Sequence, residues 1–215
     1  MKKTVFLFDL DGTLTDPGLG ITNSVMYALR KFDISAPDRA SLYKFIGPPL
    51  RDSFAMFFGF SPERSELAVK YYREYFSTRG LYENEVYDGI PELLRELKKL
   101  GKTLIVATSK PEKFAVEILR HFELYDYFDF VAGATMDGSR DRKSDVIRYA
   151  LESCHIAEKS EVIMIGDREH DIFGAKETGL DSVGVLFGYG SRDELETAGA
   201  TFIAEKPMDI LDIVK

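Results

Sequence analysis

The chain has 215 residues, of which 45% are hydrophobic, so it can bury a core of one or two domains and is not an intrinsically disordered protein. Its formal net charge of −8 argues against a nucleic-acid partner, because contact with a phosphate backbone needs a basic stripe. A single cysteine, no apolar run approaching about 20 residues and no signal-peptide pattern predict a cytoplasmic protein with no membrane partner.

Short apolar runs alternate with helical patterns along most of the chain. The runs are Val5–Phe8, Leu104–Ala107, Phe130–Ala132, Val162–Ile165, Val183–Leu186 and Thr201–Ile203. Near-continuous hydrophobicity is typical of parallel strands that are covered on both faces. Helices are predicted between them. One starts near Pro91 and ends just before Gly101, a second covers Phe114–Phe122, and a third starts at Ser191, where Glu194 is spaced for a capping box. This alternation predicts a doubly wound, Rossmann-like α/β fold with a parallel sheet.

Residues 17–84 interrupt the alternation. They contain no convincing strand, and their apolar residues recur at helical spacing, as at Ile21, Val25 and Leu29. Ser61-Pro62 is a typical helix start. The sequence therefore predicts an α/β core made of residues 1–16 and 85–215, with an all-helical domain, residues 17–84, inserted after the first strand.

Polar residues follow several of the predicted strands directly. In an open α/β sheet, ligands bind beyond the carboxyl ends of the strands, so these side chains are expected to converge on one edge. They are Asp9 and Asp11 after the first run, Thr108, Ser109 and Lys110 after the second, and Asp167 and Asp171 after Ile165, with Lys143 at the start of a later helical pattern.

The chemistry of this set indicates a site for phosphoryl transfer. Several carboxylates at one edge repel one another unless a cation neutralises them, and oxygen ligands without His or Cys suit Mg²⁺. The hydroxyls of Thr108 and Ser109 and the ammonium of Lys143 are groups that phosphoryl oxygens need. Lys110 could compete with Lys143, but Pro111 after it indicates a helix start.

The order of these motifs resembles the haloacid dehalogenase-like hydrolase superfamily over essentially the whole chain, from Asp9-Leu-Asp-Gly-Thr13 to Gly166-Asp-x-x-x-Asp171. The resemblance implies that Asp9 is the nucleophile and becomes an aspartyl phosphate, while Asp11 acts as acid and then base. It also implies that Mg²⁺ is held by Asp9, by the main-chain carbonyl of Asp11 and by Asp167, with Asp171 orienting these ligands. Thr108 and Lys143 would hold phosphoryl oxygens.

Asp11 favours a phosphatase, because dehalogenases of the superfamily lack an acid two residues after the nucleophile. The helical insert, with Gly47-Pro-Pro-Leu50, resembles that of phosphoglycolate phosphatases, and 5′-nucleotidase-like members share the outline. Arg168-Glu-His170 departs from the usual phosphoglycolate phosphatase motif. We therefore expect a small phosphorylated metabolite as substrate, phosphoglycolate or a 5′-nucleotide, with Lys44 or Arg51 near its distal anion.

Two alternatives stay open at this point. One is a sugar phosphomutase of the same superfamily, which would pass the phosphoryl group to a sugar. The other is a non-catalytic phospho-signalling or binding module built on the same fold. The chain is expected to be a monomer or a homodimer.

Overall fold

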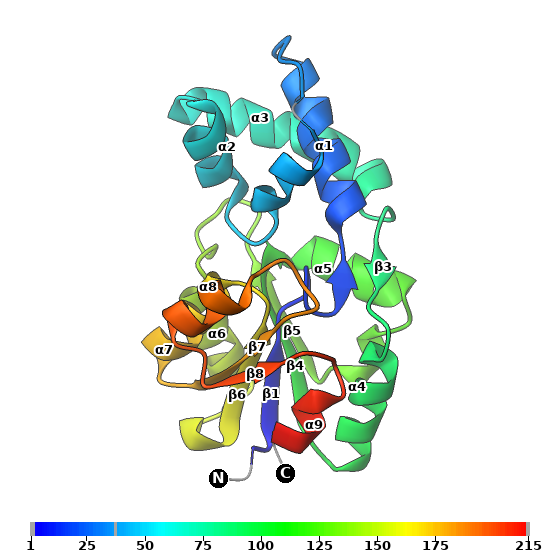
Figure 1. Cartoon of the computed structure of the whole chain (residues 1–215), viewed down its shortest axis with the longest axis vertical. Helices are drawn as coiled ribbons and strands as arrows, with labels where there is room; N and C mark the ends of the chain where they lie inside the picture. The colour runs from blue at the N-terminus through cyan, green and yellow to red at the C-terminus, as the bar shows by residue number, and fades with distance from the viewer. Residues whose placement is uncertain (1–2, 37, 214–215) are drawn as a thin grey trace. The chain divides into compact units, whose positions relative to one another are not determined.

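The computed structural model describes residues 3–36 and 38–213 (Figure 1). Its contacts divide the chain into two compact units, one of Met1–Thr15 with Val86–Lys215 and the other of Asp16–Glu85. The chain passes between them at two short strands, β2 (Thr15–Asp16) and β3 (Glu85–Val86). Residues 1–2 and 214–215 of the predicted core lie outside the described residues. Among the helices that are described, none has the length and apolar character needed to cross a membrane.

The larger unit is built on a parallel sheet with the strand order β5-β4-β1-β6-β7-β8. The strands are β1 (Val5–Phe8), β4 (Thr103–Pro111), β5 (Phe130–Ala134), β6 (Val162–Gly166), β7 (Asp181–Val185) and β8 (Phe202–Ala204). β1 lies between β4 and β6, so the chain winds outward from it in both directions, which confirms the predicted doubly wound α/β fold. Where the strand order changes direction in such a sheet, a crevice opens beyond the carboxyl ends of the central strands.

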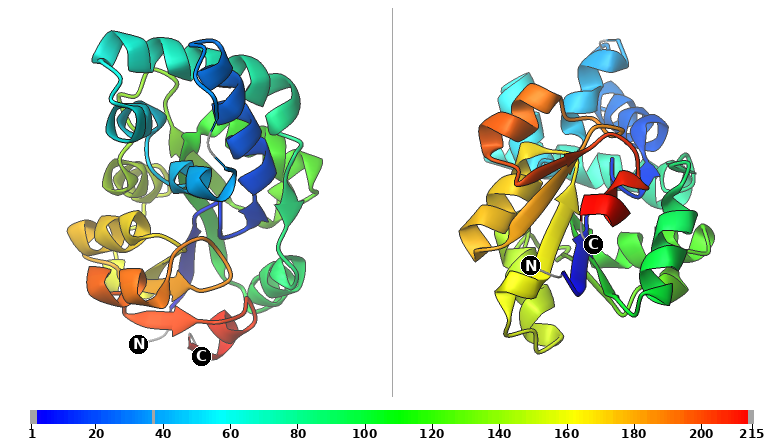
Figure 2. Two further views of the ribbon diagram at one scale, coloured as in Figure 1. Left: turned by 45° about the horizontal axis from the view of Figure 1, so that its top comes forward. Right: turned by 60° about the horizontal axis from the view of Figure 1, so that its bottom comes forward.

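Helices cover both faces of the sheet (Figures 1 and 2). Alternate residues of β1 point to opposite layers: Val5 and Leu7 pack into a core with α6 and α7, whereas Phe8 meets the ring of Phe128 on the other face. The helices of this unit are α4 (Ile90–Lys99), α5 (Glu112–His121), α6 (Lys143–Ser153), α7 (Glu169–Thr178), α8 (Arg192–Ala198) and α9 (Asp209–Ile213). Short 3₁₀ turns lie at Tyr125–Tyr127 and Lys159–Glu161.

Several elements differ from the sequence prediction. β4 continues through the polar residues Thr108 to Lys110, because its end still pairs with β5 after a shift of register. β7 and β8 are displaced from the predicted ranges by one or two residues. At α8 only half of the capping box forms: Ser191 Oγ accepts from the main-chain N–H of Glu194, but the Glu194 carboxylate bonds Arg168 and the main-chain N–H of Glu169.

The smaller unit is helical in its described residues. It contains α1 (Gly18–Arg30), a 3₁₀ turn (Ala40–Phe45), α2 (Leu50–Phe58), α3 (Pro62–Tyr75) and a π-helical turn (Phe76–Gly80). Ser61 caps α3, as its sequence predicts, by accepting from the main-chain N–H of Arg64 at 3.3 Å. Aromatic rings fill the interior, among them Phe45 and Phe54, whose centroids are 5.1 Å apart.

Candidate active site

The end of β1 places two carboxylates at the crevice. The main-chain N–H of Asp9 donates to the carbonyl of Ile165 at 2.9 Å, which ties the end of β1 to the end of β6. The chain then turns back tightly, since the N–H groups of Leu14 and Thr15 both donate to the carbonyl of Leu10. This turn holds the side chains of Asp9 and Asp11 in the interior of the larger unit, where both are buried.

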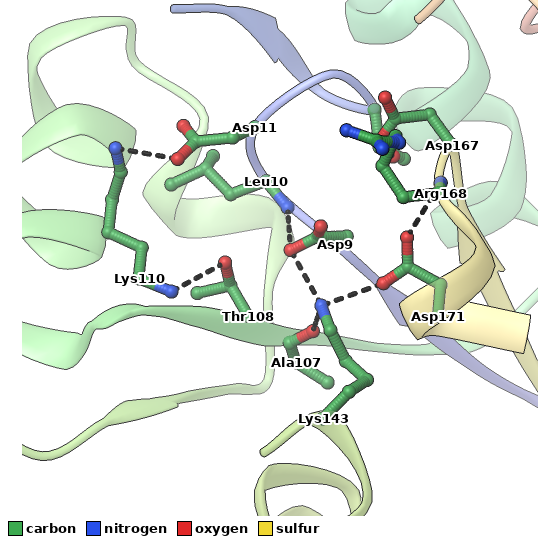
Figure 3. Close-up of polar contacts among 11 residues, drawn as sticks. Asp9, Leu10, Asp11, Ala107, Thr108, Lys110, Lys143, Asp167, Arg168 and Asp171 are labelled. Carbon is green, nitrogen blue, oxygen red and sulfur yellow. Dashed lines mark hydrogen bonds and ion pairs between the residues drawn. The ribbon is translucent and has the colours of Figure 1, made fainter. Parts of the chain in front are cut away.

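Lys143 joins two of the carboxylates (Figure 3). Its Nζ lies 2.9 Å from Oδ1 of Asp9 and 2.8 Å from Oδ1 of Asp171, and it donates to the carbonyl of Ala107 at 3.0 Å. Burial disfavours the charge on Lys143, but the carboxylates of Asp171 and Asp9 outweigh burial and raise the pKa of Lys143. The lysine is therefore a permanent cation that holds the Asp9 carboxylate in place.

Asp11 pairs with a second lysine, Lys110, which the sequence suggests only as an alternative to Lys143. Lys110 Nζ lies 2.7 Å from Oδ2 of Asp11, and both side chains are buried. Pro111 is both the last residue of β4 and the N-cap residue of α5, so the predicted helix start is confirmed, and Lys110 lies at the strand end facing Asp11. Burial raises the pKa of Asp11, and Lys110 offsets part of that rise.

Asp167 is completely buried and enclosed by main chain. Its Oδ2 accepts from the N–H of Tyr189 at 2.8 Å, and Thr13 Oγ1 lies 3.4 Å from its Oδ1. A Cβ on Gly12 would lie 2.2 Å from Oδ2, and a Cβ on Gly190 would lie 1.9 Å from the main-chain oxygen of Asp167. Neither glycine can therefore be replaced without moving Asp167. The Tyr189 contact is not evident from the sequence, in which its only signal is the Gly-x-Gly after β7.

The remaining acid, Asp171, has an ion-pair partner at one oxygen and a hydrogen-bond donor at the other. Besides the ion pair of Oδ1 with Lys143, its Oδ2 accepts from the main-chain N–H of Arg168 at 3.1 Å, at the start of α7. Burial raises the pKa of Asp171 to about 6, although Lys143 acts in the opposite direction. Arg168 in turn pairs with Glu194 at 2.8 Å, which fixes this helix start to α8.

The donor set fits a divalent cation such as Mg²⁺. Asp9, Asp167 and Asp171 each offer an oxygen within 4.8 Å of the others, and all three are buried. Lys143 supplies one positive charge to this group, and burial together with the Asp171 charge raises the pKa of Asp167 well above its ordinary value. Oxygen ligands with excess buried negative charge are what Mg²⁺ requires.

Comparison with known proteins identifies the family. The model of the haloacid dehalogenase-like hydrolases matches residues 6–185. The chain belongs to that family. A 5′-nucleotidase from Pseudomonas aeruginosa is 52% identical over 189 residues, which cover 88% of this chain and 85% of the relative. Tyrosine-protein kinase PtkA from Mycobacterium tuberculosis is 40% identical over 92% of this chain and 67% of the relative. The crystal structure of a predicted phosphatase from Clostridium acetobutylicum superposes with a TM-score of 0.95 at 50% identity, covering 99% of this chain and all of that one.

Within the haloacid dehalogenase-like hydrolases this protein is a phosphatase, and it acts on phosphorylated substrates. The remaining predicted site residues lie as follows. Thr108 is buried at the end of β4, where its Oγ1 accepts from the N–H of Lys110 at 3.2 Å, and Ser109 beside it is half-buried. Lys44 and Arg51 belong to the smaller unit: Lys44 Nζ lies 4.1 Å from the centroid of the Phe57 ring, and Arg51 pairs with Glu66.

Proposed function

We propose that this protein hydrolyses a 5′-nucleotide monoester, with Asp9 as the nucleophile and Mg²⁺ as the cofactor. The observation that supports this most is the buried carboxylate of Asp9, held by Lys143 two residues before a second buried acid, Asp11. The Leu10 N–H donates to the same Oδ1 that meets Lys143, so Oδ2 is the oxygen we assign to attack. The 52% identity to a 5′-nucleotidase favours a nucleotide over phosphoglycolate.

The reaction would proceed in two steps. Oδ2 of Asp9 forms a bond to phosphorus while the phosphorus–ester oxygen bond breaks, and Asp11 gives its proton to the departing oxygen. Asp11, now a carboxylate, then accepts a proton from a water that attacks the same phosphorus. The bond between Asp9 and phosphorus breaks, which releases inorganic phosphate and restores both side chains.

The other residues would bind and orient. Asp9, Asp167 and the main-chain carbonyl of Asp11 would hold Mg²⁺, which when bound offsets the negative charge that phosphate brings to the carboxylates. Asp171 forms an ion pair with Lys143 through Oδ1 and accepts a main-chain hydrogen bond at Oδ2, so we assign it the role of orienting Lys143. Thr108, Ser109 and Lys143 would contact phosphoryl oxygens, and Lys44 or Arg51 the distal part of the substrate.

A phosphate-release assay over a panel of phosphomonoesters tests the proposed function. With Mg²⁺ we expect the highest kcat/KM for a nucleoside 5′-monophosphate, and a lower value for phosphoglycolate. A higher value for phosphoglycolate would contradict the substrate class. Incubation with β-glucose 1-phosphate and catalytic bisphosphate tests the phosphomutase alternative: isomerisation without net phosphate release would contradict hydrolysis.

The close approach of the loop after β7 predicts the effect of Gly190→Ala. The new Cβ would collide with the main-chain oxygen of Asp167 and push the loop away, so that the Tyr189 N–H no longer fixes the Asp167 carboxylate. We expect Mg²⁺ affinity to fall by about 10-fold to 100-fold, as it does when partners of metal ligands are lost.

Titration calorimetry with Mg²⁺ measures this change without substrate. Gly101→Ala is the matched control, because Gly101 has a φ of 68° and open space around its Cβ position. It should lose stability through backbone strain, by about 1 kcal/mol, and keep its Mg²⁺ affinity. Unchanged Mg²⁺ affinity in Gly190→Ala would rule out the proposed role of the loop.

A further inference from the structure

Two buried lysines contact three of the four carboxylates of the site (Figure 3). Lys143 contacts Asp9 and Asp171, and Lys110 contacts Asp11. The mechanism above gives Lys143 a role but leaves Lys110 without one. Burying a charged lysine lowers the stability of the fold unless a partner offsets the loss of hydration. The position of Lys110 therefore needs an explanation.

The two oxygens of Asp11 have different surroundings. Oδ2 is bound by Lys110 at 2.7 Å. Oδ1 is buried and has no hydrogen-bond partner within residues 3–36 and 38–213. Buried polar atoms are nearly always hydrogen-bonded, so an unpartnered oxygen in a binding crevice indicates that a ligand atom completes it.

Lys110 is itself held firmly. It lies in β4 where the register with β5 shifts between Thr108 and Pro111, and its main-chain N–H donates to Thr108 Oγ1 at 3.2 Å. The bond from its Nζ therefore restricts Asp11 to one orientation, with Oδ2 toward β4 and Oδ1 away from the lysine.

We propose that Lys110 is a positioning residue for Asp11, which anchors Oδ2 so that Oδ1 meets the leaving-group oxygen of the substrate. The inference rests on the proposed function, in which Asp11 protonates that oxygen. When the phosphorus–oxygen bond breaks, the proton on Oδ1 moves to the leaving oxygen, and Asp11 is left as a carboxylate still paired with Lys110.

The proposal predicts that the role of Lys110 depends on the leaving group. A nucleoside leaves as an alkoxide and needs the proton, whereas 2,4-dinitrophenolate is stable without it. Loss of Lys110 should therefore slow hydrolysis of alkyl phosphates much more than hydrolysis of 2,4-dinitrophenyl phosphate. A lysine that only binds phosphate, or only supports the fold, would affect both substrates alike.

The test is kcat/KM of Lys110→Met on adenosine 5′-monophosphate or β-glycerophosphate and on 2,4-dinitrophenyl phosphate, with Mg²⁺. We expect a loss of about 100-fold on the alkyl phosphate, the lower range for general acid catalysis, and less than about 3-fold on the aryl phosphate. The ratio of the two constants does not depend on the fraction of folded enzyme. Lys110→Gln replaces the Met variant if the latter does not fold.

Two further variants serve as comparisons. Lys110→Arg keeps a cation at the position and should restore part of the loss on the alkyl phosphate. Lys113→Met removes an exposed lysine of the neighbouring α5 and should leave both constants unchanged. Equal losses on both substrates for Lys110→Met, or a ratio like that of the wild type, would overturn the proposal.

The proposed function can fail separately from this inference. Full activity in Asp9→Asn would refute the nucleophile, whatever Lys110 does. If Asp9→Asn is inactive and Asp11→Asn shows the dependence on leaving group while Lys110→Met does not, the acid is correctly assigned and the positioning role of Lys110 alone is refuted.

Discussion

Asp9→Asn is expected to release phosphate from any phosphomonoester at least about 10⁴-fold more slowly than the wild-type protein, the scale of loss when a covalent nucleophile is removed. The amide cannot form the acyl phosphate, because its nitrogen and oxygen carry no negative charge to attack phosphorus. The fold should survive, since the substitution removes a charge from a crowded group of buried acids. Initial rates with an aryl phosphate and Mg²⁺ measure the effect.

The stability of Asp9→Asn should be measured alongside its activity. In the absence of Mg²⁺ we expect a free energy of unfolding close to that of the wild type, because the relief of repulsion with Asp167 offsets the lost ion pair with Lys143, which keeps its pair with Asp171. Asp193→Asn, in the first turn of α8, makes the same chemical change at an exposed position and should keep full activity. Wild-type turnover in Asp9→Asn would show that another residue is the nucleophile.

Lys143→Met should have the largest effect on stability. It leaves Asp9 and Asp171 buried without the cation that pairs with both, and breaking a buried ion pair from one side costs about 3–5 kcal/mol. Urea unfolding in the absence of metal measures this loss. Phosphate release should fall as well, because Asp9 is no longer held.

A second substitution separates the charge effect from the loss of packing. The double variant Lys143→Met with Asp171→Asn has lost one of the two carboxylates that Lys143→Met leaves without a cation. It should therefore be more stable than the sum of the single effects predicts, by about 0.5–3 kcal/mol. Lys3→Met is the matched control: Lys3 is also buried and paired, with Asp181 at 2.6 Å, but lies before β1. It should lose stability and keep its kcat. Strict additivity of the two site substitutions would refute the ion-pair account.

The sequence predicts much of this site because strand ends are easy to recognise. Asp9, Asp167 and Thr108 each follow an apolar run, and parallel strands bring such positions to one edge. Lys143 does not follow a strand in this way. It lies in the first turn of α6, which brings its Nζ to the Asp9 carboxylate.

Two parts of the site could not be predicted, for different physical reasons. The Lys110-Pro111 pair precedes a helix, as the sequence indicates, but β4 also runs through it, because Pro111 still pairs with Ala134 of β5 after the register shift, and this long-range pairing has no local signal in the sequence. The contact from Tyr189 comes from a main-chain N–H, which any residue except proline possesses, so the side chain carries no signal for it. The role expected for Lys44 and Arg51 stays a prediction, since in the smaller unit these side chains contact Phe57 and Glu66.

The most direct test of the account is chemical trapping of the phosphorylated residue during turnover. The protein is mixed with substrate and Mg²⁺, quenched, and treated with borohydride, which reduces an acyl phosphate on aspartate to the alcohol of homoserine. Peptide mass spectrometry then locates the change. We predict homoserine at position 9, dependent on substrate and absent from Asp9→Asn. Homoserine at another aspartate, or none at position 9 while phosphate is being released, would contradict the central claim.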